Sequence, residues 1–337
     1  MTNKKYNVVG LFDGLGGGRI ALDRLGKEVC NYFAAEIHEP SIAVSSHNYP
    51  DIQHIGSVVD VDTKTLPKID LLLGGSPCQG FSFSGKMKGA VTNSGIEVTT
   101  LSQYLLLKQQ GFEFDGQSYL FWEYVRVLEE LRAVNPDIKF MLENVNMAHK
   151  WRKVFSDVLG VDYVVIDSRL FSGQVRKRLY WTNIDVDMDI EDRNISLYDV
   201  LETKCNKPHD YFPLSEAIFE NVMPSIIKNI HKFHEDIVNS NKHRYDIPVK
   251  TNYTKNIIGL TKSATLMSGS SDVFVLDKPN KTYRKLTVLE FERLQNLPDN
   301  YTNATMPNGK PVSKTHRYKM IGNGWTIDAI CHLLKNL

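Results

Sequence analysis

The chain has 337 residues, of which 42% are hydrophobic and 23% are charged, and its formal net charge is +1. This composition is that of a globular protein with a large and a smaller domain, and it excludes a chain that is basic as a whole, so any surface for nucleic acid must be local. Four widely spaced cysteines and the lack of a long apolar run exclude a disulfide framework, a zinc site and a membrane span, and they favour a cytoplasmic protein without bound metal.

Short apolar runs alternate with helical patterns over the first part of the chain. Strands are expected at 7–12, 32–37, 69–75, 138–145, 163–171 and 178–184, and helices at 19–26, 40–49, 118–133 and 148–159. Nearly continuous apolar strands that alternate with helices predict an α/β fold, in which helices cover both faces of a doubly wound, mostly parallel sheet.

This alternation of strands and helices stops near residue 186. From there to about 283 the chain is rich in Asn, Lys, His and Ser, and the stretch 228–262 holds seven basic and three acidic residues. We therefore expect three segments, which are a core domain over 1–185, a separate smaller domain over 186–283, and a C-terminal segment over 284–337 that completes the core.

Helical order returns in the C-terminal segment. In "TVLEFERLQ" (287–295), Thr287 and Glu290 fit a capping box. A last helix is expected from about Thr326.

A glycine-rich stretch, "LFDGLGGGR" (11–19), lies between the first predicted strand and helix. Glycines there let the backbone approach a ligand at the carboxyl edge of the sheet, and Glu36 ends the next strand, where an acid can bond ribose hydroxyls. The pattern lacks both the dinucleotide form and a phosphate-loop lysine, which favours a nucleoside ligand without a pyrophosphate. A doubly wound protein without a cofactor is the alternative.

Cys78 follows Pro77 in "GGSPCQGFSFSG" (74–85), directly after the predicted strand 69–75. A nucleophile needs such an exposed place at the sheet edge. A free thiol is mostly protonated near neutral pH, so a neighbouring group must aid its attack. An unreactive loop cysteine is the alternative.

Three further stretches bring polar residues to this edge. "MLENV" (141–145) ends a strand with an acid and an amide, "QVRKR" (174–178) has long polar side chains at alternate positions on one face of an extended segment, and "IGNGW" (321–325) precedes the last helix. The polar residues in question are Glu143, Asn144, Gln174, Arg176, Arg178 and Asn323. The alternatives are a surface carboxylate, a solvated basic edge strand and a simple turn.

In this order the motifs resemble those of DNA (cytosine-5) methyltransferases. The resemblance covers 7–184 and 284–337, through "FDGLGGGR", "SPCQGFS", "MLENV", "QVRKR", "RKLTVLEFERLQNLP" and "IGNGW". It implies the S-adenosylmethionine-dependent methyltransferase fold, which is Rossmann-like, with 186–283 as the target-recognition, DNA-binding domain. The long stretch 86–123 resembles phage and prophage solitary members of the family.

The resemblance implies methyl transfer from S-adenosylmethionine to carbon 5 of a cytosine that is flipped out of a specific duplex sequence, through a covalent cysteine adduct. Cys78 matches the nucleophile. Glu143 matches the acid that bonds ring nitrogen 3 and the exocyclic amine, and Arg178 matches the arginine that contacts the carbonyl oxygen of the base. Supporting roles are implied for Arg176, Asn144 and Gln174.

The resemblance also implies a set of cofactor contacts, namely Phe12, Gly14, Gly16, Glu36, Ile37, Ser57, Val58, Pro77, Leu120 and Asn323. Glu36 matches the ribose-binding acid, and Ile37 stands where many members carry an aromatic residue against the adenine. Ser57 occupies the place of the acid that usually bonds the adenine amine, and either Ser57 or the nearby Asp60 could serve. The last motif ends in "GNGW" instead of a small residue and valine. These departures are expected not to touch the chemical step.

The expected partner is double-stranded DNA that contains a short specific sequence. Gln79, Ser82 and Ser84 match the loop that closes over DNA, and Thr265 matches a Thr-Leu pair that positions the flipped nucleotide. The basic run 228–262 is expected to contact phosphates, with a solvated face as the alternative. We expect a monomer in the cytoplasm of a prokaryotic cell or a phage-infected host, and a cognate restriction endonuclease remains open.

Three other functions remain open at this stage. A tRNA cytosine-5 methyltransferase has the same fold but a shorter variable region than the about 100 residues between 186 and 283. A catalytically silent DNA-binding homologue would not need Cys78, Glu143 and Arg178 intact. A nicotinamide-dependent oxidoreductase would explain only the glycines and Glu36.

Overall fold

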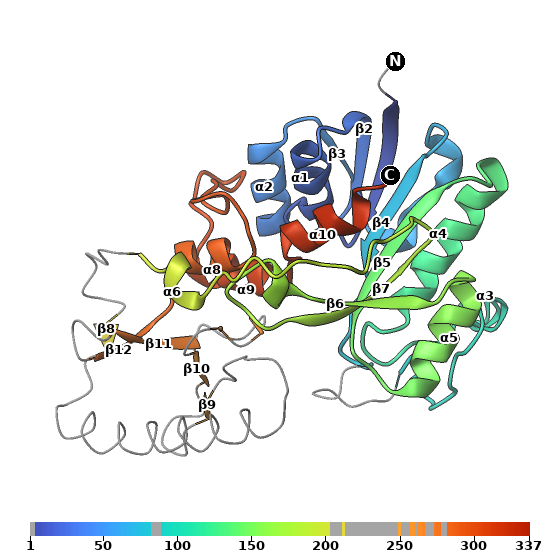
Figure 1. Ribbon diagram of the computed structural model, residues 1–337. Coiled ribbons are helices and arrows are strands. Elements are labelled where there is room, and N and C mark those ends of the chain that lie inside the picture. Colours follow the sequence, from blue (N-terminus) through green and yellow to red (C-terminus); the bar gives the residue numbers. More distant parts are fainter. Residues whose placement is uncertain are drawn as a thin grey trace.

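The computed structural model describes residues 4–81, 89–202, 211–212, 249–250, 257–259, 262–263, 265–266, 273–277 and 282–337 (Figure 1). Its main element is a seven-stranded sheet in the order β3-β2-β1-β4-β5-β7-β6. The strands are β1 (Lys5–Leu11), β2 (Glu28–Ala35), β3 (Ile52–Gly56), β4 (Leu71–Gly75), β5 (Lys139–Val145), β6 (Tyr163–Asp167) and β7 (Lys177–Thr182). Strands β1 to β5 are parallel, and β7 runs antiparallel between β5 and β6.

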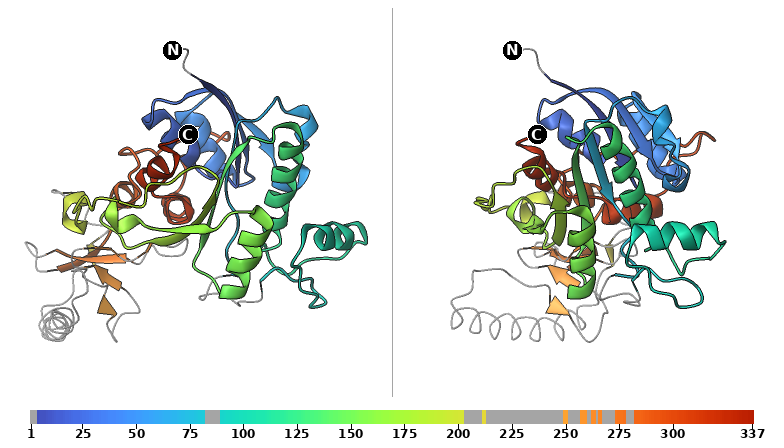
Figure 2. Two further views of the ribbon diagram at one scale, coloured as in Figure 1. Left: turned by 45° about the vertical axis from the view of Figure 1, so that its right-hand side comes forward. Right: turned by 90° about the vertical axis from the view of Figure 1, so that its right-hand side faces the viewer.

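Helices cover both faces of this sheet, as the alternation of strands and helices predicted (Figures 1 and 2). One group comprises α1 (Gly17–Arg24), α2 (Glu39–Asn48), α8 (Val288–Leu294), α9 (Lys314–Asn323) and α10 (Ile327–Leu334). The opposite face carries α3 (Leu101–Gln109), α4 (Leu120–Val134) and α5 (His149–Leu159), and the short α6 (Leu197–Val200) follows the sheet in the chain. Three short 3-10 helices are η1 (Val58–Asp60), η2 (Thr63–Thr65) and η3 (Ser168–Leu170).

The two apolar cores follow from the alternation of side chains along each strand. In β1, Val8 belongs to the core beside α1 and α10, whereas Val9 belongs to the core beside α4 and α5. The C-terminal helix α10 packs against α1, so the end of the chain completes the layer that its beginning starts (Figure 1).

A second sheet of five strands lies in the chain between the first sheet and α8. Its order is β8-β12-β11-β10-β9, with β8 (Tyr211–Phe212), β9 (Val249–Lys250), β10 (Ile257–Gly259), β11 (Val273–Asp277) and β12 (Thr282–Lys285). Strands β10 and β11 are parallel and the other pairs are antiparallel. These strands fall in the segment where the sequence predicts a smaller domain, and β12 continues to Lys285, beyond the expected boundary at 283.

The predicted strands are all present, and their ends differ for local reasons. The strand expected over 163–171 stops at Asp167, because the Asp167 side chain accepts a hydrogen bond from the backbone N–H of Arg169 and starts η3. The predicted capping box of α8 is confirmed, since the backbone N–H of Thr287 donates to Glu290 Oε2 at 2.8 Å and that of Glu290 donates to Thr287 Oγ1 at 3.2 Å.

Over the described residues, no helix is long and apolar enough to cross a membrane. In the same part of the chain, no three His, Cys, Asp or Glu side chains gather closely enough to hold a metal ion.

Candidate active site and cofactor site

The strand order brings the predicted catalytic residues to one edge of the sheet. Gly75, at the end of β4, is paired with Glu143 in β5, and Val145 in β5 is paired with Arg178 in β7. Because β7 is antiparallel to β5, its first residues lie where β5 ends. The loop that carries Cys78 leaves β4 at the same edge.

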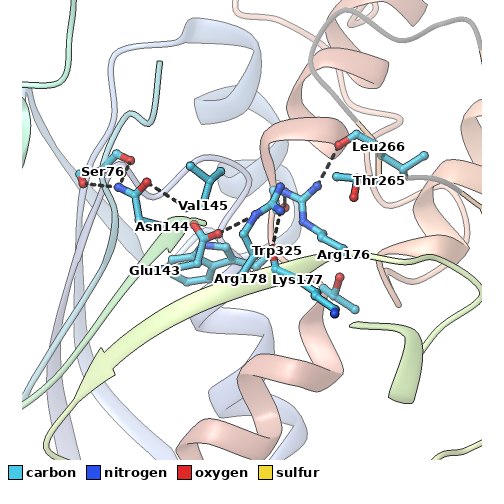
Figure 3. A network of polar contacts seen from close by, with 12 residues as sticks. Ser76, Glu143, Asn144, Val145, Arg176, Lys177, Arg178, Thr265, Leu266 and Trp325 are labelled. Carbon is cyan, nitrogen blue, oxygen red and sulfur yellow. Dashed lines mark hydrogen bonds and ion pairs between the residues drawn. The ribbon is translucent and has the colours of Figure 1, made fainter. Parts of the chain in front are cut away.

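Two donors hold the carboxylate of Glu143 (Figure 3). Arg178 Nε lies 3.0 Å from Glu143 Oε1, and Trp325 Nε1 donates to Glu143 Oε2 at 3.3 Å. The side chains of Glu143 and Arg178 are 12% and 14% exposed, so the pair is shielded from water but still open to a ligand.

Trp325 is a contact that sequence reasoning missed. The replacement of valine by tryptophan in the last motif was expected not to touch the chemical step. That expectation did not include a contact between this residue and Glu143, which the indole N–H bonds. The unusual residue in an otherwise matching motif was the signal that could have drawn attention to it.

The thiol of Cys78 is half-buried. Burial raises its pKa, the negative charge of Glu143 raises it further, and the positive charge of Arg178 opposes the rise. The thiol is therefore protonated near neutral pH, in agreement with the expectation that its attack needs a neighbouring group.

Hydrogen bonds fix the peptide on both sides of Cys78. Asn144 Nδ2 donates to the carbonyl oxygen of Ser76 at 3.1 Å and to its hydroxyl at 3.0 Å. The backbone N–H of Gly80 donates to Ser118 Oγ at 2.8 Å. Phe81 is buried, and its ring packs edge-on against those of Trp151 and Phe155 at 5.2 Å between centroids. Gln79 is exposed, whereas Ser82 and Ser84 lie outside the described residues.

Gln174 and Arg176 are buried, which rules out a solvated basic edge strand. Gln174 Nε2 donates to the carbonyl oxygen of Leu294 at 2.7 Å and to Gln295 Oε1 at 2.8 Å. The two residues therefore face the C-terminal segment, whereas Arg178 faces Glu143.

The guanidinium of Arg176 joins three parts of the chain (Figure 3). It donates to the carbonyl oxygens of Leu266 at 2.8 Å, Gly322 at 3.2 Å and Gly324 at 2.9 Å. Burial lowers the pKa of Arg176 to about 9. These bonds connect the segment 174–178 with Leu266 and with the segment before α10.

The Thr-Leu pair lies against the extended segment 174–176, which leads into β7. Thr265 Oγ1 donates to the carbonyl oxygen of Val175 at 2.6 Å, and Gln174 forms a bridge with Ser263. The expectation of phosphate contacts is wrong for Lys262. Its side chain is 6% exposed, and Nζ donates to the carbonyl oxygens of Arg169 at 2.9 Å and of two further residues, Ser172 and Ile195. The other six basic side chains of 228–262 lie outside the described part of the chain.

The carboxylate of Glu36 is bonded by one backbone N–H of the glycine-rich loop and by two backbone N–H groups that follow Glu36 in the chain. Glu36 Oε2 accepts a hydrogen bond from the backbone N–H of Gly14 at 2.9 Å, and Oε1 accepts from those of Ile37 and His38 at 2.8 Å each. Phe12 has φ +56°, in the left-handed region that residues with a Cβ rarely adopt, so the turn that enters this loop is tightly constrained.

The residues of this loop fit a nucleoside ligand. Ile37 is 69% exposed, so an apolar face stands open beside an acid whose Oε2 accepts only one hydrogen bond and retains a lone pair for a hydroxyl group. Gly14 and Gly16 adopt φ +58° and +84°, which bring the backbone close to that acid and open the N-terminus of α1.

The remaining predicted cofactor residues occupy the ends of neighbouring elements. Ser57 caps η1 by accepting a hydrogen bond from the backbone N–H of Val59 at 3.3 Å, and Asp60 is exposed. Val58 is buried and follows β3 at the carboxyl edge. The half-buried Pro77 and Leu120 and the exposed Asn323 complete the set.

Asp13, inside the glycine-rich loop, was not predicted as a residue of interest. Its side chain is 7% exposed, and Oδ1 accepts a hydrogen bond from the hydroxyl of Tyr32 at 2.5 Å. Oδ2 has no partner among the described residues. Burial raises the pKa of Asp13 to about 7.

Comparisons with known proteins agree with the motif analysis. The family model described as C-5 cytosine-specific DNA methylase matches residues 6–337. Type II methyltransferase M1.ScrFI of Lactococcus lactis subsp. cremoris is 28% identical over 97% of this chain and 76% of that protein. Type II methyltransferase M.NlaX of Neisseria lactamica is 24% identical over 96% of this chain and 94% of that protein. Orphan methyltransferase M.SPRI of Bacillus phage SPR is 30% identical over 55% of this chain and 39% of that protein.

Solved structures confirm the fold. The Dnmt2 methyltransferase of S. pombe has a TM-score of 0.62 at 14% identity and covers 98% of this chain and 97% of its own. The Entamoeba histolytica methyltransferase EhMeth has a TM-score of 0.61 at 13% identity and covers 99% and 98%. The predicted α/β fold of the methyltransferase type is therefore confirmed.

Proposed function

The chain belongs to the C-5 cytosine-specific DNA methylase family, and from this premise we propose which of its residues carry out each part of the reaction. The family and the fold imply S-adenosylmethionine as the methyl donor. Cys78 is the nucleophile, and Glu143 and Arg178 hold the target cytosine. The observation that carries this proposal is the 3.0 Å ion pair between Glu143 and Arg178 at the sheet edge where the Cys78 loop begins.

Cys78 Sγ forms a bond with carbon 6 of the cytosine as the double bond between carbons 5 and 6 opens, and the thiol proton passes through water to ring nitrogen 3. The ring then gains electron density, and carbon 5 becomes able to attack a methyl group. Glu143 bonds ring nitrogen 3 and the exocyclic amine, while Arg178 bonds the carbonyl oxygen, so the developing charge is stabilised by groups that are already in place. S-adenosylmethionine supplies the methyl group. A water molecule removes the proton of carbon 5, and the bond between sulfur and carbon 6 breaks.

Glu36 and the glycine-rich loop form the proposed cofactor site. The carboxylate of Glu36 binds the loop through the backbone N–H of Gly14 and is fixed by those of Ile37 and His38, and Oε2 retains a lone pair for a ribose hydroxyl. The exposed side chain of Ile37 offers an apolar surface to the adenine. The N-terminus of α1, which begins at Gly17, faces the same ligand.

Duplex DNA with a short specific sequence is the proposed substrate, and a cytosine must leave the stack before it can reach Cys78. We assign Gln79 to the DNA contact because it is exposed next to the nucleophile. Thr265 is held against Val175, in the segment that carries Arg176 and leads to Arg178, which supports a role beside the flipped nucleotide. The segment 186–283 is the proposed target-recognition domain.

The test is transfer of a labelled methyl group from S-adenosylmethionine by the purified protein. Duplex DNA of mixed sequence and tRNA are offered separately, and Cys78→Ser is the control. We expect label at carbon 5 of cytosines in DNA and none with the variant. Label on tRNA alone would favour the RNA methyltransferase, and no label on either would favour the silent homologue.

A further inference from the structure

The indole of Trp325 occupies a space that two glycines leave open. A Cβ atom on Gly75 would lie 3.0 Å from Trp325 Nε1 and 3.2 Å from Glu143 Oε2. A Cβ atom on Gly17, in the first turn of α1, would lie 3.4 Å from Trp325 Cε3. The ring therefore fits between the start of α1, beside the cofactor loop, and the end of β5, which carries the acid.

The backbone around Trp325 is held on both sides. The carbonyl oxygen of Gly324 accepts hydrogen bonds from Arg176 Nη2 at 2.9 Å and from Gln295 Nε2 at 3.2 Å. On the other side, Thr326 Oγ1 donates to Gln295 Oε1 at 2.7 Å. The backbone from which the indole projects is thus held by buried groups, which places the indole N–H beside Glu143.

We propose that Trp325 is a positioning residue for methyl transfer, which acts by orienting the carboxylate of Glu143. This inference rests on the proposed function, in which Glu143 bonds the target cytosine. The indole N–H binds Oε2 and Arg178 binds Oε1, so the two donors fix the plane of the carboxylate before substrate enters. The remaining lone pair of one oxygen can accept from the exocyclic amine of the base, and that of the other can accept from ring nitrogen 3 once this nitrogen carries a proton.

This arrangement favours the chemical step because the acid needs no reorganisation when charge develops on the base. A carboxylate with one donor can rotate about its side-chain bonds, and each orientation that misses the base lowers the rate. Hydrogen bonds to charged groups are also among the stronger ones in proteins. The effect of Trp325 should therefore appear in the rate of transfer and not in the affinity for the cofactor.

Two variants remove the same contact in different ways. Trp325→Phe keeps an aromatic ring but deletes the N–H. Gly75→Ala keeps the indole but places a methyl group 3.0 Å from Nε1 and 3.2 Å from Oε2, closer than a Cβ atom usually approaches, so that one of these atoms must shift. Both should lower the single-turnover rate of methyl transfer by about tenfold, the effect of one hydrogen bond to a charged group. The Kd for S-adenosylmethionine should stay within about twofold of the wild-type value, since the contact acts on the transition state.

Trp122→Phe is the matched control. Trp122 is fully buried in α4, and its indole nitrogen has no hydrogen-bond partner in the part of the chain that the structure describes. This variant removes the same atoms from a core site, so it reports the loss of stability alone. Thermal unfolding of all variants accompanies the rate measurements.

Glu143→Gln separates this inference from the proposed function. Arg178 would hold the amide oxygen, so the amide N–H₂ group would face the indole N–H and the two donors could not bond. Trp325→Phe should then cause no further loss in the Glu143→Gln background. The inference is overturned if Trp325→Phe keeps at least half of the wild-type rate, or if its effect is the same in both backgrounds. A fully active Glu143→Gln variant would instead overturn the proposed role of Glu143.

Discussion

The side-chain amide of Asn144 donates to both the carbonyl oxygen and the hydroxyl of Ser76, at 3.1 and 3.0 Å. This pair connects the end of β5 with the loop that leads to Cys78. Asn144 follows Glu143 directly but points to the opposite face of the sheet, because side chains alternate along a strand. One strand thus carries the acid on one face and the anchor of the nucleophile loop on the other.

Asn144→Ala should slow methyl transfer by about tenfold or more, because the Cys78 loop loses its attachment to β5. The hydroxyl and carbonyl groups of Ser76 would also remain buried without this donor, at a cost of about 1–3 kcal/mol in the free energy of unfolding. Turnover and urea unfolding measure the two effects. Ser76→Ala is the control, and it should have a smaller effect because the carbonyl acceptor remains. Equal effects of the two variants would contradict the proposed attachment.

Cys78 should form a covalent complex with DNA that carries 5-fluorocytosine in the recognised sequence. Sulfur adds to carbon 6 and the methyl group moves to carbon 5, but fluorine cannot leave as a cation, so the adduct persists. A shifted band on a denaturing gel reports it. The band should require S-adenosylmethionine and vanish in Cys78→Ser, which should still bind the cofactor. A cofactor-dependent band in the serine variant would refute the assignment of the nucleophile.

Glu36→Ala should weaken the binding of S-adenosylmethionine by about tenfold or more. The variant loses a carboxylate that accepts from three backbone N–H groups and is proposed to bond the ribose. The affinity for DNA should change far less. Isothermal titration calorimetry measures the affinity for S-adenosylmethionine, and DNA gel shifts measure the affinity for DNA. Glu39→Ala removes an exposed acid at the start of α2 and is the matched control. An unchanged cofactor affinity of Glu36→Ala would place the cofactor elsewhere.

Asp13 should make the stability of the protein depend on pH. Its folded-state pKa of about 7 lies above the ordinary value of 3.8, so the folded state binds the proton more tightly than the unfolded state. The contribution of this group to stability is fully present below the ordinary pKa and is lost as the pH rises through about 7. Asp13→Asn has no such proton to lose.

Urea unfolding of the wild type and of Asp13→Asn between pH 5 and 8 tests this. Between pH 5 and 8, the free energy of unfolding of the wild type should fall by roughly 3 kcal/mol more than that of the variant. Asp23→Asn, which changes an exposed acid in α1, should follow the wild type. Parallel pH profiles of the wild type and Asp13→Asn would show that Asp13 does not titrate in this range.

Replacement of 186–283 by the corresponding segment of a related enzyme should change the methylated sequence and keep the chemistry. The incoming segment must place its own Thr-Leu pair at 265–266, because Thr265 bonds Val175 and the carbonyl oxygen of Leu266 bonds Arg176. Sequencing of methylated cytosines in host DNA identifies the new recognition sequence. An active chimera that keeps the original recognition sequence would refute the domain assignment.

Much of the fold could be predicted because most strands are covered by helices on both faces of the sheet. Such strands appear in the sequence as apolar runs. Strand β3 was missed because its five residues include Gln53 and His54, which break the apolar pattern at the edge of the sheet. Helix α9 was missed because its sequence is mostly polar. Local pattern carries little information where an element packs through only a few residues.

The candidate site was predicted through motifs, and its internal contacts were not. Trp325 and Glu143 are 182 positions apart, and no local pattern joins them. A solvated basic edge strand was the alternative for Arg176, and phosphate contacts were expected for the run that includes Lys262, yet both side chains are buried against backbone carbonyl oxygens. A buried charged side chain can connect distant segments when several of their carbonyl groups accept hydrogen bonds from it. Only the three-dimensional structure shows that these carbonyl groups lie close together.

The contacts of Arg176 also determine when the enzyme becomes competent during its synthesis. Its guanidinium bonds Gly322 and Gly324, which follow it by 146 and 148 positions, so the site has a high contact order. A nascent chain that has emerged only as far as α8 lacks these carbonyl groups and the indole of Trp325. Translation adds about 5–20 residues per second, so these carbonyl groups are made seconds after Arg176. The contacts of Arg176 can therefore form only after α9 and the start of α10 have been synthesised and have docked.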